Sequence, residues 1–406
     1  MSTSHTSQKS HKSSKSQILE GSQAIAQVIN NIKPAVVSAY PITPQTHIVE
    51  DLAKLKADGK AKYEYVRAES EFAAASIVAG ASATGVRVYT ATSSQGLLLM
   101  TEVIFNIAGM RLPVVLTCAN RGVSAPITIW NDHQDAMTIR DAGWIMLFAE
   151  NHQEAIEQHL IAYKVAEIAK LPAMVNIDGF VLTHAYEDVV IPTPEQVKKY
   201  LPDYKPTKGE FLDPSNPITF GAFATPLHYQ ELREELQNDL VDSQKLINEA
   251  YEKLQKTIPS VIKPKEKHTR INNGLLEYYG PKNPKIIIVA MGSVVGTIKD
   301  AIDEINKKIS LSSSVGVLKI KTFRPFPVSQ ISDITKKAKY VAVIEKAISL
   351  GSVGPLMLEI KNANQGKAKI QNFIVGLGGK DITKKIIKQI TEEVKKNNNE
   401  TKFIAN

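Results

Sequence analysis

The chain has 406 residues, of which 43% are hydrophobic and 22% charged, and its formal net charge is +8 at pH 7. This length predicts two or three domains with cores of their own, and the composition is typical of globular proteins. No apolar run approaches the roughly 20 residues of a membrane span, and the N-terminus lacks a secretory signal. The single cysteine, Cys118, excludes a disulfide framework and an iron–sulfur cluster, which takes about four thiolates. We therefore expect a cytoplasmic protein without membrane contact.

The positive charge is concentrated at the two ends of the chain. Residues 1–16 are mostly Ser, His and Lys, so we expect a disordered basic tail. A second concentration of lysines lies between Lys384 and Lys402, on an expected terminal helix and a tail over 397–406. Aromatic and basic residues are not interleaved as in a base-stacking surface, so we expect no nucleic-acid partner. A solvated surface or an acidic protein face accounts for these lysines.

Residues 17–191 are predicted to form the first domain, in which helical and strand patterns alternate. Several of the strands are continuous apolar runs, which indicates a parallel sheet covered by helices on both faces. The expected helices are 21–32, 47–56, 73–83, 97–110 and 153–169, and the expected strands are 35–40, 86–91, 114–120, 144–148 and 173–180.

Polar residues follow the strands of this first domain. They are Thr43 in the turn Pro41–Pro44, the turn Ser93–Gly96, Arg121, and the loop Asn131–Asp135. In open parallel sheets a ligand binds outside the carboxyl ends of the strands. The sequence therefore predicts a ligand site at this edge of the sheet.

The stretch Arg67–Gly96 places an acid before a helix of small residues. Glu69 and Glu71 precede a run of Ala, Ser and Gly from Ala73 to Ala83. An acid at a helix start commonly complements the helix dipole, whereas a buried acid needs a specific partner. Small residues allow a backbone or a flat ligand to approach closely. The residues alone leave both interpretations of the acid open.

Residues 192–284 are predicted to be a proline-rich linker with a long amphipathic helix whose apolar stripe covers a neighbouring surface. Residues 285–396 are predicted to form a second open parallel α/β domain of four or five strands. The glycine turns at Gly292-Ser293 and Gly376–Gly379 suit a phosphate, but neither follows the dinucleotide fingerprint or the phosphate-binding loop motif. A nucleotide site there is the less favoured interpretation.

Four motifs carry a family resemblance over residues 18–390. They are Tyr40-Pro41-Ile42-Thr43-Pro44, Glu69-Ser70-Glu71, Thr92-Ser93-Ser94-Gln95-Gly96-Leu97 and Asn131-Asp132-His133-Gln134-Asp135. In this order and spacing the chain resembles the α subunits of multi-subunit 2-oxoacid:ferredoxin oxidoreductases, and most of all those of the pyruvate:ferredoxin oxidoreductases (pyruvate synthases).

The resemblance implies thiamine diphosphate chemistry. Such enzymes decarboxylate pyruvate, pass electrons to ferredoxin and transfer the acetyl group to coenzyme A. By resemblance, the first domain is a thiamine-diphosphate pyrimidine-binding domain and the second is similar to the transketolase C-terminal domain, with Phe323–Pro327 as a packing loop. Glu71 matches the acid that activates the cofactor, and Ser94, Gln95 and Gly96 match its surroundings. Thr43 and Arg121 match the residues that bind the substrate.

Other parts of such an enzyme are missing from the sequence. The Asp-Gly pairs at 58–59 and 178–179 lack the motif that binds Mg²⁺ and the diphosphate. The resemblance places Mg²⁺ and the iron–sulfur clusters on partner subunits, so we expect no metal ligand on this chain. The implied partners are a β subunit that holds the diphosphate, γ and δ subunits, and ferredoxin. The chain alone should be inactive.

Three alternatives remain open from the sequence. The same kind of complex can act on 2-oxoglutarate or a branched-chain 2-oxoacid, because the depth of the side-chain pocket is not legible in sequence. A non-catalytic scaffold subunit would keep the fold without needing Glu71. A nicotinamide dehydrogenase is disfavoured because the dinucleotide fingerprint is absent.

Overall fold

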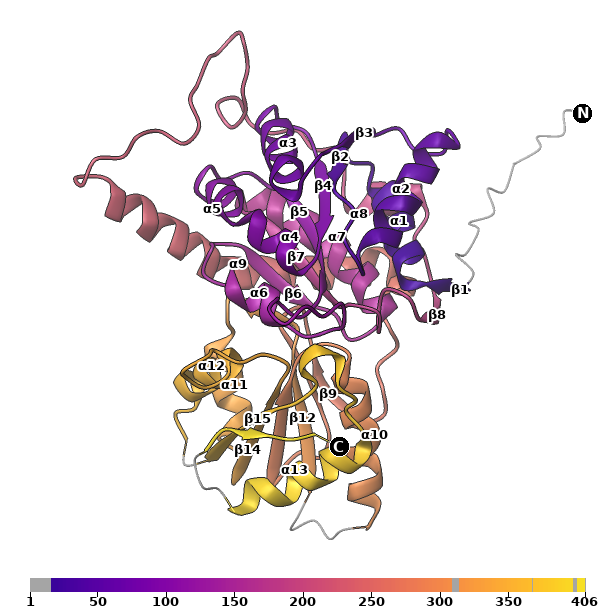
Figure 1. Ribbon diagram of the computed structural model, residues 1–406, viewed down its shortest axis with the longest axis vertical. Helices are drawn as coiled ribbons and strands as arrows, with labels where there is room; N and C mark the ends of the chain where they lie inside the picture. Colours follow the sequence, from indigo (N-terminus) through magenta and orange to yellow (C-terminus); the bar gives the residue numbers. More distant parts are fainter. Residues whose placement is uncertain (1–15, 309–313, 367, 397–399, 406) are drawn as a thin grey trace, which may run out of the picture.

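The computed structural model describes residues 16–308, 314–366, 368–396 and 400–405. It contains two α/β units, the N-terminal one above the C-terminal one in Figure 1. The basic tail predicted over residues 1–16 lies outside the described residues except for Ser16, and the predicted C-terminal tail is described only in part. No described helix is both long enough and apolar enough to cross a membrane.

The first unit is built on a seven-stranded sheet in the order β13-β6-β7-β5-β4-β2-β3. Its strands pair in parallel except for β13, which is antiparallel to β6. The predicted parallel α/β class is thus confirmed, with an antiparallel strand at one edge. The strands are β2 (Val36–Ala39), β3 (Glu64–Arg67), β4 (Val88–Thr92), β5 (Val115–Asn120), β6 (Ile145–Phe148), β7 (Ala173–Asp178) and β13 (Thr322–Arg324).

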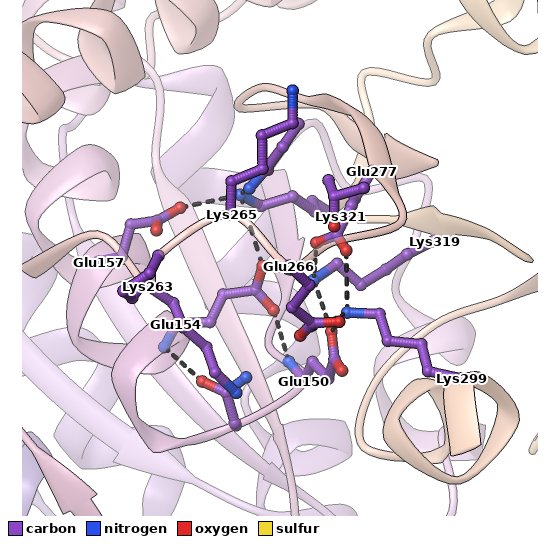
Figure 2. A pocket seen from close by; sticks show the side chains of 14 residues that line it. Glu150, Glu154, Glu157, Lys263, Lys265, Glu266, Glu277, Lys299, Lys319 and Lys321 are labelled. Carbon is purple, nitrogen blue, oxygen red and sulfur yellow. Dashed lines mark hydrogen bonds and ion pairs between the residues drawn. The ribbon is translucent and has the colours of Figure 1, made fainter. Parts of the chain in front are cut away.

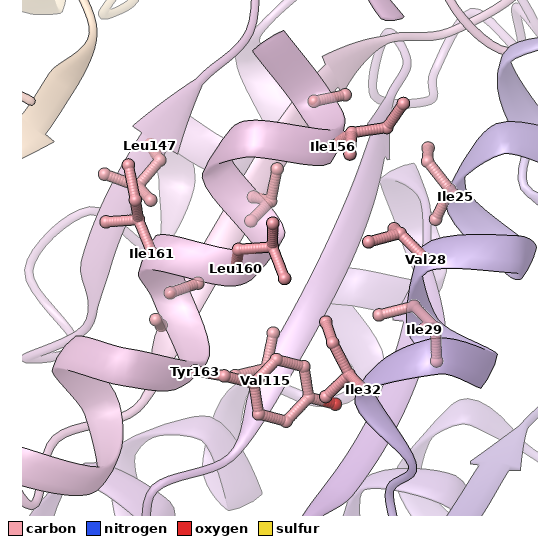
Figure 3. Close-up of a cluster of buried hydrophobic side chains, with 14 of the residues drawn as sticks. Ile25, Val28, Ile29, Ile32, Val115, Leu147, Ile156, Leu160, Ile161 and Tyr163 are labelled. Atoms are coloured by element: carbon pink, nitrogen blue, oxygen red, sulfur yellow. The ribbon is translucent and has the colours of Figure 1, made fainter. Parts of the chain in front are cut away.

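Alternate residues of the central strand β5 enter two different cores. Val115 and Ala119 pack under α1 (Gly21–Ile32) and α7 (His152–Ala169). Leu116 and Cys118 face the opposite core, which includes α3 (Glu71–Ala83), α4 (Ser94–Leu99) and α5 (Thr101–Gly109). Figure 3 shows the first core, where isoleucines of α1 meet the aliphatic face of α7. Burial on both faces explains why the strands read as continuous apolar runs.

The small residues of α3 serve packing within the chain. The helix starts at an N-cap, Ser70, whose hydroxyl accepts a hydrogen bond from the Ala73 N–H at 3.1 Å. Ala74, Ala75 and Ala79 are buried in the second core. The alternative of a flat ligand lying on this helix face is therefore not supported, because these alanines face the protein interior.

The segment expected as a linker is more structured than its composition suggests. It begins after a two-stranded ribbon of β1 (Gln17–Glu20) and β8 (Tyr186–Val189), and contains α8 (Pro194–Tyr200) and the 29-residue α9 (Tyr229–Thr257). The predicted apolar stripe of α9 is buried from Leu236 to Leu254, and α9 contacts α7 and α8. Leu232 is 51% exposed because the first turns of α9 project beyond the unit, next to the extended arm of residues 202–228 (Figure 1).

The second unit holds a seven-stranded sheet in the order β16-β15-β14-β11-β12-β10-β9. It is larger than the four or five strands expected, because two strands from the linker segment and one C-terminal strand join it. The strands are β9 (Thr269–Asn272), β10 (Leu276–Tyr279), β11 (Ile286–Ala290), β12 (Val315–Ile320), β14 (Tyr340–Glu345), β15 (Lys369–Ile374) and β16 (Lys402–Phe403). Its helices are α10 (Val294–Lys308), α11 (Val328–Thr335), α12 (Pro355–Ala363) and α13 (Lys384–Lys396).

A strand and a buried ion network join the two units. β13 leaves the second unit and pairs with β6, which buries Phe323 against Phe148 at a ring distance of 6.3 Å. Figure 2 shows the network, in which Lys319 Nζ lies 2.7 Å from Glu150 and 2.9 Å from Glu277. Its buried members are Glu150, Glu154, Glu157, Glu277, Lys299, Lys319 and Lys321. These contacts fix the second unit against the strand ends of the first.

Candidate active site

The predicted site residues lie at the carboxyl ends of β2, β4 and β5, except for Glu71, which starts α3 after the neighbouring strand β3. Thr43 follows β2, Ser94 follows β4 and Arg121 directly follows β5. The order of the strands therefore brings three distant parts of the sequence to one edge.

Asp135 holds this edge together, and sequence reasoning did not single it out. It is fully buried in α6 (Gln134–Thr138) and accepts hydrogen bonds from the backbone N–H groups of Ser94 (3.0 Å) and Arg121 (2.9 Å). The side chain of Asn120 donates to it at 3.0 Å. The pKa of Asp135 is raised because burial disfavours the charged form, and these hydrogen bonds offset part of that rise. Asp135, in the loop motif Asn131–Asp135, thus links the ends of two strands.

Arg121 and Thr43 are brought together through the backbone. Arg121 Nη1 donates to the Thr43 carbonyl at 2.9 Å, and its Nε donates to the Thr128 carbonyl at 2.7 Å. The arginine is 6% exposed, and burial lowers its pKa. Its three other N–H donors form no hydrogen bond within the described residues, so a planar fork of donors remains for an anion. Thr43 itself is exposed.

Glu71 is a buried acid with no hydrogen-bond partner among the residues that the structure describes. It is 7% exposed, and no group in the described part of the chain donates a hydrogen bond to its carboxylate. Glu69, two residues earlier, is exposed. A buried carboxylate is costly unless a donor meets it, so Glu71 fits an external hydrogen-bonding group such as a pyrimidine nitrogen.

Gly96 makes room for Glu71. A Cβ atom at position 96 would lie 2.6 Å from Glu71 Oε1 and 2.5 Å from Thr92 Oγ1, closer than such atoms approach. The structure thus pairs two of the predicted residues. Ser94 is instead used internally, because its buried hydroxyl contacts the Gly122 carbonyl and the Gln95 amide oxygen, each at 2.6 Å. Gln95 is half-buried beside it.

A test of this contact is the change Gly96→Ala. The added methyl group should push the Glu71 carboxylate away and weaken thiamine diphosphate binding to the assembled enzyme, measured by calorimetry. The matched control is Gly80→Ala in α3, where no atom lies within 4 Å of the added Cβ. Removing a helix glycine should stabilise that variant by about 0.5–1 kcal/mol and leave cofactor affinity unchanged. Equal affinities in both variants would contradict the steric role of Gly96.

Residues of the first unit contact the two glycine turns of the second unit. The Ser293 N–H, at the start of α10, donates to Asp178 Oδ2 at 2.9 Å, so a carboxylate of the first unit fills the place where a phosphate would bind. A Cβ on Gly379 would lie 2.5 Å from Trp130 Cβ. Both turns thus pack against the first unit, and a nucleotide site there is not supported.

His133 belongs to the same interdomain contact. Its Nε2 lies 2.7 Å from Asp178 Oδ1, and Lys346 Nζ lies 2.7 Å from Asp178 Oδ2. All three are buried. The His133 ring is therefore held by a contact within the chain.

Comparisons with known proteins agree with this geometry. Residues 27–252 match the family described as pyruvate flavodoxin/ferredoxin oxidoreductase, thiamine diphosphate-binding, and residues 284–387 match pyruvate:ferredoxin oxidoreductase core domain II. The pyruvate synthase subunit PorA of Methanosarcina barkeri is 44% identical over 93% of this chain and 92% of its own length. The PorA subunit of Methanocaldococcus jannaschii is also 44% identical, over 93% and 95%.

One further relative and one solved structure are named for oxoacids other than pyruvate. The ketoisovalerate oxidoreductase subunit VorA of Pyrococcus horikoshii is 39% identical over 93% of both chains. A solved 2-oxoglutarate:ferredoxin oxidoreductase from Magnetococcus marinus shares the fold with a TM-score of 0.70 at 20% identity. This chain spans 65% of that longer chain and is covered over 94% of its own length.

The match over residues 27–252 places the first unit in a thiamine-diphosphate-binding family with a parallel α/β sheet. The chain belongs to the pyruvate flavodoxin/ferredoxin oxidoreductase family, and it is a subunit of an oxidoreductase.

Proposed function

We propose that this chain is the α subunit of a pyruvate:ferredoxin oxidoreductase that converts pyruvate and coenzyme A to acetyl-CoA, reversibly, and passes electrons to ferredoxin. The observation that carries the proposal is the buried Glu71 carboxylate, which lacks a hydrogen-bond partner among the described residues and lies against Gly96. Identities of 44% to PorA subunits over more than nine-tenths of the chain support the pyruvate assignment.

Glu71 would hold the pyrimidine ring of thiamine diphosphate. When bound, this cofactor would supply a nucleophilic carbon and an electron sink for the electron pair left by decarboxylation. Glu71 would accept a hydrogen bond from the pyrimidine nitrogen N1′ and so would favour the tautomer that serves as the base. Because the acid is buried, its charge acts in a medium of low polarity, where such a hydrogen bond is strong.

Arg121 and Thr43 would bind the substrate carboxylate. The unused donors of Arg121 form a planar fork suited to a bidentate carboxylate. Its bonds to the Thr43 and Thr128 carbonyls hold the guanidinium in place, so little side-chain entropy is lost when the substrate binds.

The remaining parts of the enzyme would come from partner subunits. The carboxyl edge of the sheet offers Glu71 and Arg121, but the sequence has no motif for Mg²⁺ and the diphosphate, and Cys118 alone cannot bind a cluster. The proposal therefore requires a β subunit with the Mg²⁺–diphosphate site, γ and δ subunits with iron–sulfur clusters, and ferredoxin as the acceptor.

Reconstitution tests this function. The assembled complex should reduce ferredoxin with pyruvate and coenzyme A faster than with 2-oxoglutarate or 2-ketoisovalerate. The lone chain should show no turnover and little affinity for thiamine diphosphate. Tight cofactor binding by the lone chain would contradict a shared site, and a higher kcat/KM for 2-ketoisovalerate would favour the branched-chain alternative that the 39% identity to VorA suggests.

The change Arg121→Lys tests the substrate site. Lysine keeps the charge but loses the planar fork, so we expect a higher KM for pyruvate and a lower kcat/KM. Steady-state kinetics of the assembled complex measure this split. Unchanged values of KM and kcat would assign Arg121 to loop structure alone.

A further inference from the structure

A cluster of two histidines and a glutamate lies outside the residues assigned to the active site. Glu20 ends β1, His47 lies in the first turn of α2 (Thr46–Ala57), and His184 lies in the turn between β7 and β8. One ligand atom of each residue lies within 4.8 Å of the other two. The fold thus brings together three potential metal ligands from three separate segments of the first unit.

Glu20 is a buried acid that lacks a permanent cation. It is 8% exposed, and its side chain contacts His47, whose Nδ1 lies 2.6 Å from Glu20 Oε1. Within the described residues no lysine or arginine pairs with it. As the N-cap residue of α1 it forms no capping hydrogen bond with its side chain. A carboxylate in such surroundings favours a bound positive charge.

The imidazole rings of His47 and His184 lie side by side. Their ring centroids lie 4.3 Å apart, at an angle of 35°. Thr183 Oγ1 lies 2.6 Å from His184 Nδ1, which leaves Nε2 as the free nitrogen. A hydrogen bond of this kind typically orients a metal-binding histidine.

We propose that Glu20, His47 and His184 bind one divalent cation of the zinc type. Two histidines and a carboxylate are a ligand set that Zn²⁺ uses, with water in the fourth position. Metal–ligand bonds of about 2.0–2.2 Å place tetrahedral ligands about 3.3 Å apart. The Glu20–His47 contact of 2.6 Å must therefore open slightly, and ligand atoms farther apart, up to 4.8 Å, must close. His47 is free to move, because its side chain is 45% exposed.

The bound ion would fasten the β1–β8 ribbon to α2. This role is independent of the proposed function, and it differs from the expectation that the chain carries no metal ligand. The sequence gives no motif for it, because Glu20 and His47 lie 27 residues apart and His184 lies in a third segment.

Calorimetric titration of the full chain with ZnCl₂ tests the proposal. The protein would carry His5→Gln and His11→Gln, so that the histidines of the N-terminal segment cannot bind the ion. One Zn²⁺ should bind per chain. His184→Gln, His47→Gln and Glu20→Gln should each weaken the Kd by at least about tenfold, the lower bound for losing even an outer ligand contact.

The matched control is His228→Gln, an exposed histidine at the start of α9, which should leave the Kd unchanged. Circular dichroism identifies any variant that fails to fold, and the other two ligand variants then decide. Co²⁺ in place of Zn²⁺ should give the visible absorption of a four-coordinate site in the parent protein and lose it in His184→Gln. Absence of stoichiometric Zn²⁺ binding, or equal Kd values in the parent and the folded ligand variants, would overturn the proposal.

Discussion

The change Glu71→Gln should lower the turnover of the assembled complex by about 10²–10⁴-fold, the range that general acid–base groups contribute. Glutamine keeps the shape of the side chain and its contact with Gly96, but an amide cannot favour protonation of N1′ as a carboxylate does. Because Gly96 leaves room for either group, the fold and most of the cofactor affinity should remain. Steady-state kinetics and calorimetry separate these effects.

The control for this prediction is Glu69→Gln. Glu69 carries the same charge two residues earlier but is exposed, so its replacement should change turnover little. A larger loss in the Glu69 variant than in the Glu71 variant would show that the wrong acid had been identified.

The change Asp178→Asn should destabilise the folded chain by about 3–5 kcal/mol, as expected when one partner of a buried ion pair is lost. Burial alone would raise the pKa of Asp178, but Lys346 and His133 hold it well below its usual range. The variant leaves the Lys346 ammonium buried between the two units without its carboxylate. Urea unfolding, followed by fluorescence of the buried Trp144, measures the loss.

The pH dependence of this stability follows from the direction of the shift. A carboxyl group with a depressed pKa in the folded state stabilises the protein above its unfolded pKa of about 3.9, and the contribution is lost as the pH falls toward the folded pKa. The difference between wild type and Asp178→Asn should therefore be full at pH 7 and shrink below about pH 4. Glu304→Gln, which removes a half-buried surface acid paired with Lys384 and Lys388, should change the unfolding midpoint far less. Equal midpoints for all three proteins at pH 7 would contradict the role of Asp178.

Much of the fold could be predicted from local patterns. The helix predicted over 21–32 is α1 as observed, and the strand after it ends at the expected turn. The apolar runs correctly indicated a parallel sheet, because burial on both faces leaves no polar side to the strands. The antiparallel strands could not be predicted in the same way. β13 has three residues and pairs with β6, nearly 180 positions earlier, so no local period marks it.

The candidate site could be predicted in its residue types and in its place, but not in its internal bonds. Thr43, Arg121 and Ser94 each follow a strand, so the edge of the sheet brings them together. The organising role of Asp135 rests on hydrogen bonds from backbone N–H groups, which no sequence motif encodes. The close contact between Glu71 and Gly96 joins residues 25 positions apart, and it too became visible only in the structure.

The glycine turns suggest a site that the structure does not support, whereas the Glu20–His47–His184 cluster is a candidate site that the sequence does not suggest. Gly292-Ser293 has the composition of a phosphate site, yet Asp178 of the first unit fills it. The histidine cluster has no recognisable spacing, yet the fold brings its ligand atoms together. In both cases contacts between distant segments decide, and these depend on tertiary packing.

Exchange of the thiazolium C2 proton for deuterium, measured in the assembled complex, tests the assignment of Glu71 most directly. It reports activation of the cofactor without substrate binding or electron transfer. We predict that Glu71→Gln slows the exchange by about 10²–10⁴-fold while Glu69→Gln exchanges at nearly the wild-type rate. Wild-type exchange in Glu71→Gln with the cofactor fully bound would contradict the account.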